Sequence, residues 1–217
     1  METIAGLREG SPQGHASAGG FWALVLAAGA GSRFGGDKLR ATFGARSLID
    51  ASVAIARTAP VEGVVVLTRP GDRLVSEPEV RVLAVADWAE GMGATLRAGI
   101  AALPAEATGA YVFLGDMPRV PTAVLRPLAD AVTGGAPAAA PTFGGRTGHP
   151  VLFAAALFPD LLALTGDRGA RRLLDRLGER LALVPAPDDG VLFDVDTPDQ
   201  LRSALTQASG APPRNAR

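Results

Sequence analysis

Residues 21–38 read FWALVLAAGAGSRFGGDK. The unbroken apolar run from Phe21 to Ala28 predicts a buried β-strand, and the glycines that follow it predict a loop at the end of that strand. Such a loop exposes backbone N–H groups that can hold phosphate oxygens. Arg33 and Lys38 add positive charge to the same loop. The stretch therefore predicts a strand that leads into a binding site for a polyanion.

The remainder of the chain alternates short apolar runs with helical patterns, and residues 143–150 are predicted to form a loop or hairpin. Further strands are predicted at 61–68, 80–86, 109–114, 136–142, 181–184 and 191–195, and helices at 47–58, 93–102, 121–132, 152–164, 170–177 and 198–207. This alternation predicts a layered α/β domain around a mostly parallel sheet. Ligands of such sheets bind at the carboxyl ends of the strands, where the loops 29–38, 115–118 and 194–198 fall.

The composition limits the classes of protein. A chain of 217 residues, 47% of them hydrophobic and 20% charged, suits one folded domain, predicted here at 21–207 between flexible tails at 1–20 and 208–217. The net charge of −1 argues against nucleic acid as the main partner. Without cysteine there is no disulfide or thiolate site. No apolar run approaches the length of a membrane span or a signal peptide, so we expect a cytoplasmic protein with no membrane partner.

Two common glycine-loop patterns do not fit the opening loop. The phosphate-binding loop GxxxxGK[ST] fails because Asp37 separates Gly36 from Lys38 and Leu39 follows. The dinucleotide pattern GxGxxG fails because Phe34 takes the place of the third glycine. Lys38 is the only lysine in a chain that otherwise uses arginine, which favours a position that needs a compact ammonium group. The alternative is a glycine-rich turn with charges placed by chance.

An acid follows the strand predicted at 109–114, in the sequence Gly115-Asp116-Met117-Pro118. Mg²⁺ on a nucleotide is usually held by one or two carboxylates together with phosphate oxygens and water. We expect Asp116 to be such a carboxylate and Gly115 to leave room for the nucleotide. The alternative is that Asp116 caps the next helix.

A second acidic cluster reads Asp194-Val-Asp196-Thr197-Pro198. Two acids that lie two residues apart on an extended chain point to the same side and repel each other unless a cation lies near them. This favours binding of a metal or substrate. Thr197 is predicted to cap the helix that begins at Pro198. That leaves Asp194 as the preferred functional residue, with Asp196 as the alternative.

Six motifs, in order along residues 21–207, resemble the MobA-like NTP transferase family and above all its molybdenum cofactor cytidylyltransferases. The motifs are LAAGAGSRFGGDKL from Leu26, the segment 87–99, GDMP at 115–118, GHPVLF at 148–153, LTGDRGAR at 164–171 and DVDTPDQL at 194–201. The resemblance implies a three-layer Rossmann-like fold of the nucleotide-diphospho-sugar transferase type. It also implies Mg²⁺ on Asp116 and on Asp194 or Asp196, with catalytic roles for Arg33, Lys38 and Asp116.

The resemblance also assigns binding residues. Those for the nucleotide are Leu26, Ala27, Ala28, Gly29, Ala30, Gly31, Arg33, Lys38, Gly91, Met92 and Thr95. The residues implied for the acceptor are His149, Arg168 and Arg171. From the residues alone, the segment 87–99 reads as an ordinary amphipathic helix, His149 as a structural hydrogen-bonding group and the two arginines as exposed side chains at the start of a helix.

The implied reaction transfers CMP from CTP to the terminal phosphate of molybdopterin and releases pyrophosphate. Cytidylyltransferases of this kind tend to carry LAAG where guanylyltransferases carry LAGG, and the methyl group of Ala28 narrows the site in favour of a pyrimidine. GTP, or another small phosphorylated acceptor, is the alternative within the enzyme class, and a nucleotide-binding regulatory protein is the alternative outside it. The resemblance further implies transient contact with a molybdoenzyme or its chaperone.

Overall fold

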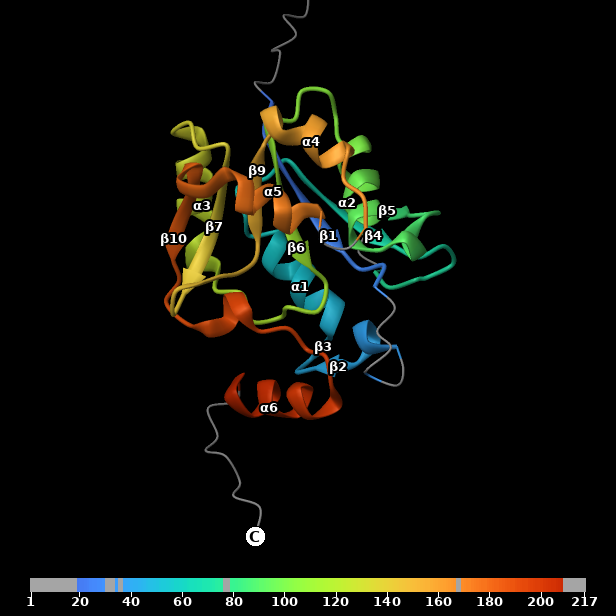
Figure 1. The fold of residues 1–217 in the computed structure, drawn as a ribbon. Helices are drawn as coiled ribbons and strands as arrows, with labels where there is room; N and C mark the ends of the chain where they lie inside the picture. The colour runs from blue at the N-terminus through green and yellow to red at the C-terminus, as the bar shows by residue number, and fades with distance from the viewer. Residues whose placement is uncertain (1–18, 30–33, 35–36, 76–78, 167–168, 209–217) are drawn as a thin grey trace, which may run out of the picture.

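The computed structural model describes residues 19–29, 34, 37–75, 79–166 and 169–208, arranged around one central sheet (Figure 1). In spatial order the strands are β10 (Leu181–Pro185), β7 (Ala138–Phe143), β9 (Val151–Ala154), β6 (Gly109–Leu114), β1 (Phe21–Leu26), β4 (Gly63–Thr68) and β5 (Arg81–Ala84), with β8 (Arg146–Thr147) paired to β7. All pairings are parallel except those of β8 and β9. The sheet is therefore mostly parallel, as predicted.

Helices cover both faces of the sheet and make the predicted three layers (Figure 1). One face carries α1 (Leu48–Ala56) and α3 (Leu125–Thr133), and the other carries α2 (Met92–Ala101), α4 (Phe158–Leu162) and α5 (Gly169–Leu177). A small hairpin, β2 (Thr42–Phe43) with β3 (Arg46–Ser47), precedes α1, and α6 (Pro198–Ala208) ends the described chain. Single 3-10 turns are η1 (Lys38–Arg40), η2 (Trp88–Glu90), η3 (Thr122–Val124), η4 (Ala155–Leu157), η5 (Gly178–Arg180) and η6 (Asp189–Leu192).

Strand β1 shows how the sequence produces this layering. Successive side chains of a strand point to opposite faces. Ala23 and Val25 therefore enter the core beneath α1 and α3, whereas Leu24 and Leu26 enter the core beneath α2, α4 and α5. All four side chains are buried, which explains why the strand reads as a continuous apolar run.

The register of β1 aligns the strand ends that matter for function. Leu26 lies opposite Leu67 of β4 on one side and opposite Leu114 of β6 on the other. The hydrogen bonds continue beyond the strands, from Ala27 N–H to the Leu67 carbonyl and from Gly115 N–H to the Leu26 carbonyl. The loops that follow the three strands consequently leave the sheet at one edge.

Two sequence predictions are wrong. The helix predicted at 152–164 begins instead with β9, a buried strand inserted antiparallel between β6 and β7, and helix α4 starts only at Phe158. A short apolar run such as VLF fits a buried strand or a buried helix equally well. The strand predicted at 191–195 pairs with no other strand in the described parts of the chain, and η6 covers its first residues.

The other elements lie within a few residues of their predicted positions, and β6 matches its predicted range. The predicted tails fall almost wholly outside the described residues. In the described parts of the chain, no helix has the length and apolar character needed to cross a membrane.

Tyr111 offers a direct test of the core between the sheet and α3. Its ring is fully buried, and its hydroxyl donates a 2.6 Å hydrogen bond to the Leu125 carbonyl at the start of α3. We expect Tyr111→Phe to lower the free energy of unfolding by about 1 kcal/mol, because it removes one buried hydrogen bond and keeps the ring. Urea denaturation measures this change. An unaltered midpoint would show that the bond contributes nothing to stability.

Candidate functional site

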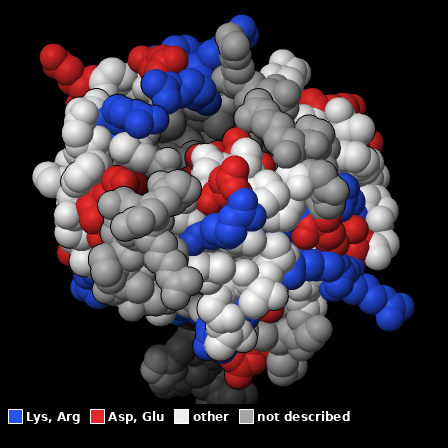
Figure 2. Space-filling model, turned by 90° about the horizontal axis from the view of Figure 1, so that it is seen from below, with Lys and Arg blue, Asp and Glu red and all other residues white. Residues whose placement is uncertain are grey.

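A cavity of about 570 Å³ opens at the edge where β1, β4 and β6 end. Its lining combines these strand ends with η1, η2 and the first turn of α2, and consists of Leu26, Ala27, Ala28, Gly29, Asp37, Lys38, Leu39, Arg69, Trp88, Ala89, Gly91, Met92, Thr95, Leu114 and Asp116. The volume lies in the range of pockets for small molecules and cofactors. Seen from this end of the molecule, charges of both signs are interspersed over the visible face (Figure 2).

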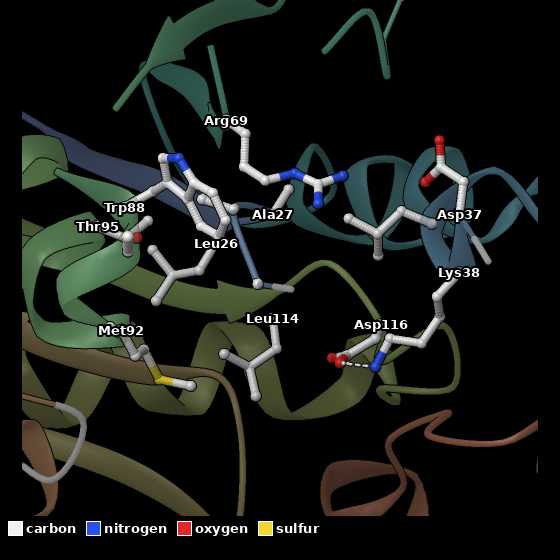
Figure 3. A pocket seen from close by; sticks show the side chains of 15 residues that line it. Leu26, Ala27, Asp37, Lys38, Arg69, Trp88, Met92, Thr95, Leu114 and Asp116 are labelled. Carbon is white, nitrogen blue, oxygen red and sulfur yellow. Dashed lines mark hydrogen bonds and ion pairs between the residues drawn. The ribbon is translucent and has the colours of Figure 1, made fainter. Parts of the chain in front are cut away.

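The cavity has an apolar end and a charged end (Figure 3). Trp88, Met92 and Thr95 lie at the first, and Lys38 and Asp116 lie at the second. The Lys38 Nζ is 2.8 Å from Asp116 Oδ2 and 3.2 Å from Asp196 Oδ1. Asp116 is 78 positions and Asp196 is 158 positions from Lys38 in the sequence, yet both acids contact its ammonium group.

Lys38 is charged in this setting. Burial lowers the pKa of its ammonium, but hydrogen bonds and charge attraction to Asp116 and Asp196 outweigh burial, so that the net shift of the pKa is upward. Only 10% of the Lys38 side chain is exposed, compared with 23% for Asp116 and 32% for Asp196. The ion pairs are thus screened less by solvent than surface pairs are.

Asp116 retains one unused oxygen. Its Oδ1 is buried and has no hydrogen-bond partner among the residues that the structure describes. A buried carboxylate oxygen without a partner is costly, and a cation is the ligand that offsets this cost.

Gly115, which precedes Asp116, has a different role from the one predicted. A side chain there would meet the Ile49 Cδ1 at 2.9 Å and the Leu26 carbonyl oxygen at 3.1 Å, so the glycine makes room for protein atoms and not for the nucleotide.

The segment 189–196 is fixed against the end of β6 by backbone contacts. Val195 N–H donates to the Asp116 carbonyl at 3.0 Å, and His149 N–H donates to the Val191 carbonyl at 2.8 Å. Gly190 packs so closely that an added Cβ would lie 2.1 Å from the Arg119 carbonyl oxygen. These contacts bring the second acidic cluster to Asp116 without any strand pairing.

Thr197 caps α6 as predicted, since its Oγ1 accepts from Gln200 N–H at 3.2 Å. The Gln200 Oε1 accepts in return from the N–H groups of Asp196 and Thr197 at 2.7 and 2.8 Å. This reciprocal arrangement is a capping box, and it fixes the backbone of Asp196. Asp196 therefore reaches Lys38 from a rigid position.

Asp194 and Asp196 play different parts. Asp196 pairs with Lys38, whereas Asp194 was the residue preferred from the sequence. Asp194 is partly buried, and its pKa is raised first by burial and then by the negative charges of Asp196 and Asp116. An acid whose ionisation is opposed by two neighbouring carboxylates gains from the approach of a cation.

His149 lies two residues before β9 and does not line the cavity. Burial lowers the pKa of its imidazole, and the Val112 carbonyl, Asp116 and Asp194 only partly oppose this effect. Its Nδ1 is 3.5 Å from the Val112 carbonyl oxygen, which is a long contact. The imidazole is neutral at pH 7, as a hydrogen-bonding group for a substrate would be.

Other residues predicted for the site have mixed outcomes. Ala30, Gly31, Arg33 and Arg168 lie outside the described residues. Arg171 lies on α5 with 69% of its side chain exposed, forms an ion pair with Asp175 and takes no part in lining the cavity.

Sequence reasoning missed Arg69, which immediately follows β4 and lines the cavity. Its Nε donates to Asp72 at 2.9 Å, and its guanidinium carbon lies 5.7 Å from the centre of the Trp88 ring. Within the described part of the chain, no further hydrogen bond engages its terminal nitrogens. The guanidinium is thus oriented by an acid and an aromatic ring and can still donate. Its place directly after an apolar strand was the signal that could have identified it.

The donor set fits a divalent cation that arrives with phosphate groups. Carboxylate oxygens suit Mg²⁺ and Mn²⁺, and Asp116 Oδ1 is free to bind one. In the described residues, no group of three or more His, Cys, Asp or Glu side chains can hold a metal ion. Mg²⁺ commonly takes one or two carboxylates and completes its shell with substrate phosphates and water, which matches this arrangement.

These features define a class of protein: an α/β protein with a nucleotide-sized cavity at the carboxyl edge of its sheet and a paired lysine and acid in the cavity wall. Residues 23–181 match the MobA-like NTP transferase domain. The chain belongs to this family and is a nucleotidyltransferase, and proteins of the family bind nucleoside triphosphates.

Relatives with sequence similarity carry diverse names. The chain is 31% identical over 194 residues to the nicotine blue oxidoreductase of Paenarthrobacter nicotinovorans, a match that covers 84% of this chain and 95% of that protein. It is 34% identical over 128 residues to the purine catabolism protein PucB of Bacillus subtilis, a match that covers 55% of this chain and only 60% of PucB.

Among solved structures, Rv0371c of Mycobacterium tuberculosis H37Rv superposes with a TM-score of 0.78 at 27% identity, over 87% of this chain and 98% of Rv0371c. A manganese complex of Rv0371c matches with a TM-score of 0.71 at 25% identity, over 85% of this chain and 97% of that structure.

Arg69 provides one test of the cavity. We expect Arg69→Met to weaken the binding of a nucleoside triphosphate about tenfold, because a pre-oriented, charge-assisted donor is lost. Isothermal titration with CTP and Mg²⁺ measures the dissociation constant. Arg73→Met is the matched control, since Arg73 is exposed and does not line the cavity. Equal affinities for the two variants would remove Arg69 from the site.

His149 provides a second test through its titration. The pKa of His149 in the folded protein lies below the ordinary 6.5, so the unfolded chain binds a proton at this imidazole more tightly than the folded protein does. Stability should then fall as the pH drops below about 6.5 and be unaffected by this residue at higher pH. NMR of the imidazole resonances should show one histidine that titrates below 6.5. His15 is the only other histidine, so His15→Gln assigns the two signals. A His149 signal that titrates at or above 6.5 would contradict the burial described here.

Proposed function

We propose that the protein transfers CMP from CTP to the terminal phosphate of molybdopterin, with Mg²⁺ as cofactor. The observation that supports this most is the pair Lys38–Asp116, which lies at the charged end of a nucleotide-sized cavity. A triphosphate needs a cation and a metal site at one end, and a base and ribose need an apolar surface at the other. The cavity offers both.

The nucleotide has one orientation that satisfies both ends. The base and ribose lie against Trp88, Met92 and Thr95 and beside the methyl group of Ala28. The phosphates extend past Gly29 towards Lys38. An added Cβ at Gly29 would meet no atom of the described residues within 4 Å, which leaves room for a ligand against them. Arg69 then lies along the side of the nucleotide and donates to its acceptor atoms.

Asp116 would hold the metal, and Asp194 or Asp196 would contribute a further oxygen. A bound Mg²⁺ would supply neutralisation of the negative charge on the phosphate oxygens. Lys38 stabilises negative charge on the phosphates and on the leaving pyrophosphate. The manganese complex known for Rv0371c is consistent with a divalent cation in this fold, and we favour Mg²⁺ as the physiological ion.

The reaction needs no covalent enzyme intermediate. An oxygen of the terminal phosphate of the acceptor attacks the α-phosphorus of CTP and forms the new P–O bond. The bond from the α-phosphorus to the β-phosphate oxygen breaks, and pyrophosphate leaves with that electron pair. The protein contributes alignment and charge stabilisation, which dominate in such transfers.

We assign the choice between CTP and GTP to Ala28, which follows the end of β1. Ala28 is buried at the cavity wall, and its methyl group reduces the space available to a purine. GTP is the alternative if the base lies away from this methyl group. The acceptor side is assigned to His149, whose neutral imidazole lies near Asp116 and Asp194. Acceptor roles for Arg168 and Arg171, and transient contact with a molybdoenzyme or its chaperone, remain predictions from the sequence.

Pyrophosphate release tests this proposal. Purified protein is given Mg²⁺, molybdopterin and each of CTP, GTP, ATP and UTP in turn. We expect CTP to be used far faster than the others. Ala28→Gly should raise kcat/KM for GTP relative to CTP by about tenfold, since one methyl group in a pocket is worth 1–3 kcal/mol. Asp116→Ala should lower kcat on the order of 1,000-fold because the main metal ligand is lost.

The controls separate chemistry from folding. Asp130→Ala removes an exposed acid from α3, outside the cavity lining, and should leave the rate unchanged. Circular dichroism confirms that each variant is folded. Equal rates with all four nucleotides, or a fully active Asp116→Ala variant, would refute the proposal.

A further inference from the structure

Lys38 occupies the place where positive charge is needed when no ligand is bound. Its ammonium bridges Asp116 and Asp196, and both oxygens that it contacts are carboxylate oxygens of the proposed metal site. The same lysine is the cation proposed for the triphosphate. The ammonium group has three N–H donors and the two acids take two of them, so only one is left for a phosphate oxygen. A triphosphate that engages Lys38 more fully must therefore draw it away from at least one of the acids.

Binding of a divalent cation without a nucleotide is electrostatically unfavourable at this site. The charge of Asp116 and Asp196 is already compensated in part by Lys38, and two cations between the same carboxylates repel each other. The short contact of 2.8 Å also removes Asp116 Oδ2 as a free ligand. Only Asp116 Oδ1 remains buried and without a partner among the described residues.

When a divalent cation binds together with a nucleotide, the charges around Lys38 are different. The triphosphate brings several negative charges to the charged end of the cavity, and these charges offer Lys38 an alternative partner. Once Lys38 turns to the phosphates, Asp116 Oδ2 joins Oδ1 as an oxygen that can bind the metal. The longer contact, 3.2 Å to Asp196, is the one that is easier to release.

We propose that Lys38 is a counter-ion of the acid pair in the ligand-free enzyme and transfers to the triphosphate when the nucleotide binds, so that the metal binds tightly only together with the nucleotide. This inference rests on the proposed function, because it assigns an order of binding to the same site. Lys38 thereby prevents the acids from retaining a metal without substrate.

The choice of lysine suits this role. Its ammonium is a point charge on a flexible stem, whereas an arginine fork would bind a carboxylate through two parallel hydrogen bonds and fix the pair. The backbone of η1 is held by hydrogen bonds from Arg40 N–H to the Asp37 carbonyl and from Ala41 N–H to the Lys38 carbonyl, both 3.1 Å. The transfer therefore needs rotation of one side chain and no movement of the helix turn.

Binding of Mn²⁺ without nucleotide tests the inference directly. Electron paramagnetic resonance counts free Mn²⁺ in titrations of wild-type protein, Lys38→Met, Lys38→Arg and Arg126→Met. We expect Lys38→Met to bind Mn²⁺ alone at least tenfold more tightly than wild type, and to bind CTP in the presence of Mn²⁺ more weakly. Lys38→Arg should bind Mn²⁺ alone no better than wild type. Arg126→Met removes an exposed cation on α3 and should match wild type.

A thermal melt gives a second readout. Without Lys38, Asp116 loses the ammonium group that compensates its charge, so we expect Lys38→Met to melt below wild type in EDTA. We also expect this variant to gain more thermal stability from added Mn²⁺ than wild type does. If Lys38→Met does not fold in EDTA, its recovery by Mn²⁺ without nucleotide supports the inference, and failure of Mn²⁺ to recover it overturns the inference.

The outcomes separate this inference from the proposed function. If Lys38→Met binds free Mn²⁺ no more tightly than wild type while wild type still transfers CMP, the counter-ion role is wrong and the function stands. If wild type binds neither CTP with Mn²⁺ nor Mn²⁺ alone, both fail together.

Discussion

The pairing of β1 with both β4 and β6 is the constraint on which the site depends. Because Leu26 lies in register with Leu67 and with Leu114, three loops leave the sheet at the same edge. The cavity lies at this edge, and its wall includes one residue that follows each strand: Gly29 after β1, Arg69 after β4 and Asp116 after β6. A slip of one residue in either pairing would turn buried side chains to the opposite face, so the two cores fix this register strongly.

Charge is the second constraint. Asp116, Asp194 and Asp196 lie close enough for Asp194 to be perturbed by the other two, and Lys38 compensates part of this negative charge. An arrangement of this kind is poorly suited to an empty site and well suited to one filled by a metal and phosphates. The tension between stability without ligand and binding of ligand is a common property of active sites.

Family membership identifies the class of reaction, whereas the side chains around the cavity determine the substrate. The match over residues 23–181 establishes the class of reaction, whereas the relatives bear names as different as a purine catabolism protein and an oxidoreductase. A shared fold carries many functions, and the substrate is chosen by the side chains around the cavity. In this chain those side chains include Ala28, Arg69 and Trp88, which therefore carry more information on the substrate than the sheet does.

The sequence by itself determined most of the local elements and most of the cavity-lining residues. Apolar runs marked the parallel strands, turn residues marked the hairpin at 143–150, and the glycine loop with Lys38 and the acid at 116 located the charged end. Local patterns suffice there because burial imposes a period on each strand or helix.

The tertiary structure alone decided how distant residues meet. It placed β9 between β6 and β7, because a short apolar run does not reveal its pairing partner. It brought Asp196 and not Asp194 to Lys38, because backbone contacts from Val195 to Asp116 and a capping box at Thr197 orient that segment. It also brought Arg69 into the cavity, because its orientation comes from Asp72 and from Trp88 on another loop. Contacts between residues far apart in the chain leave no periodic signal in the sequence, and these contacts shape the charged end of the site.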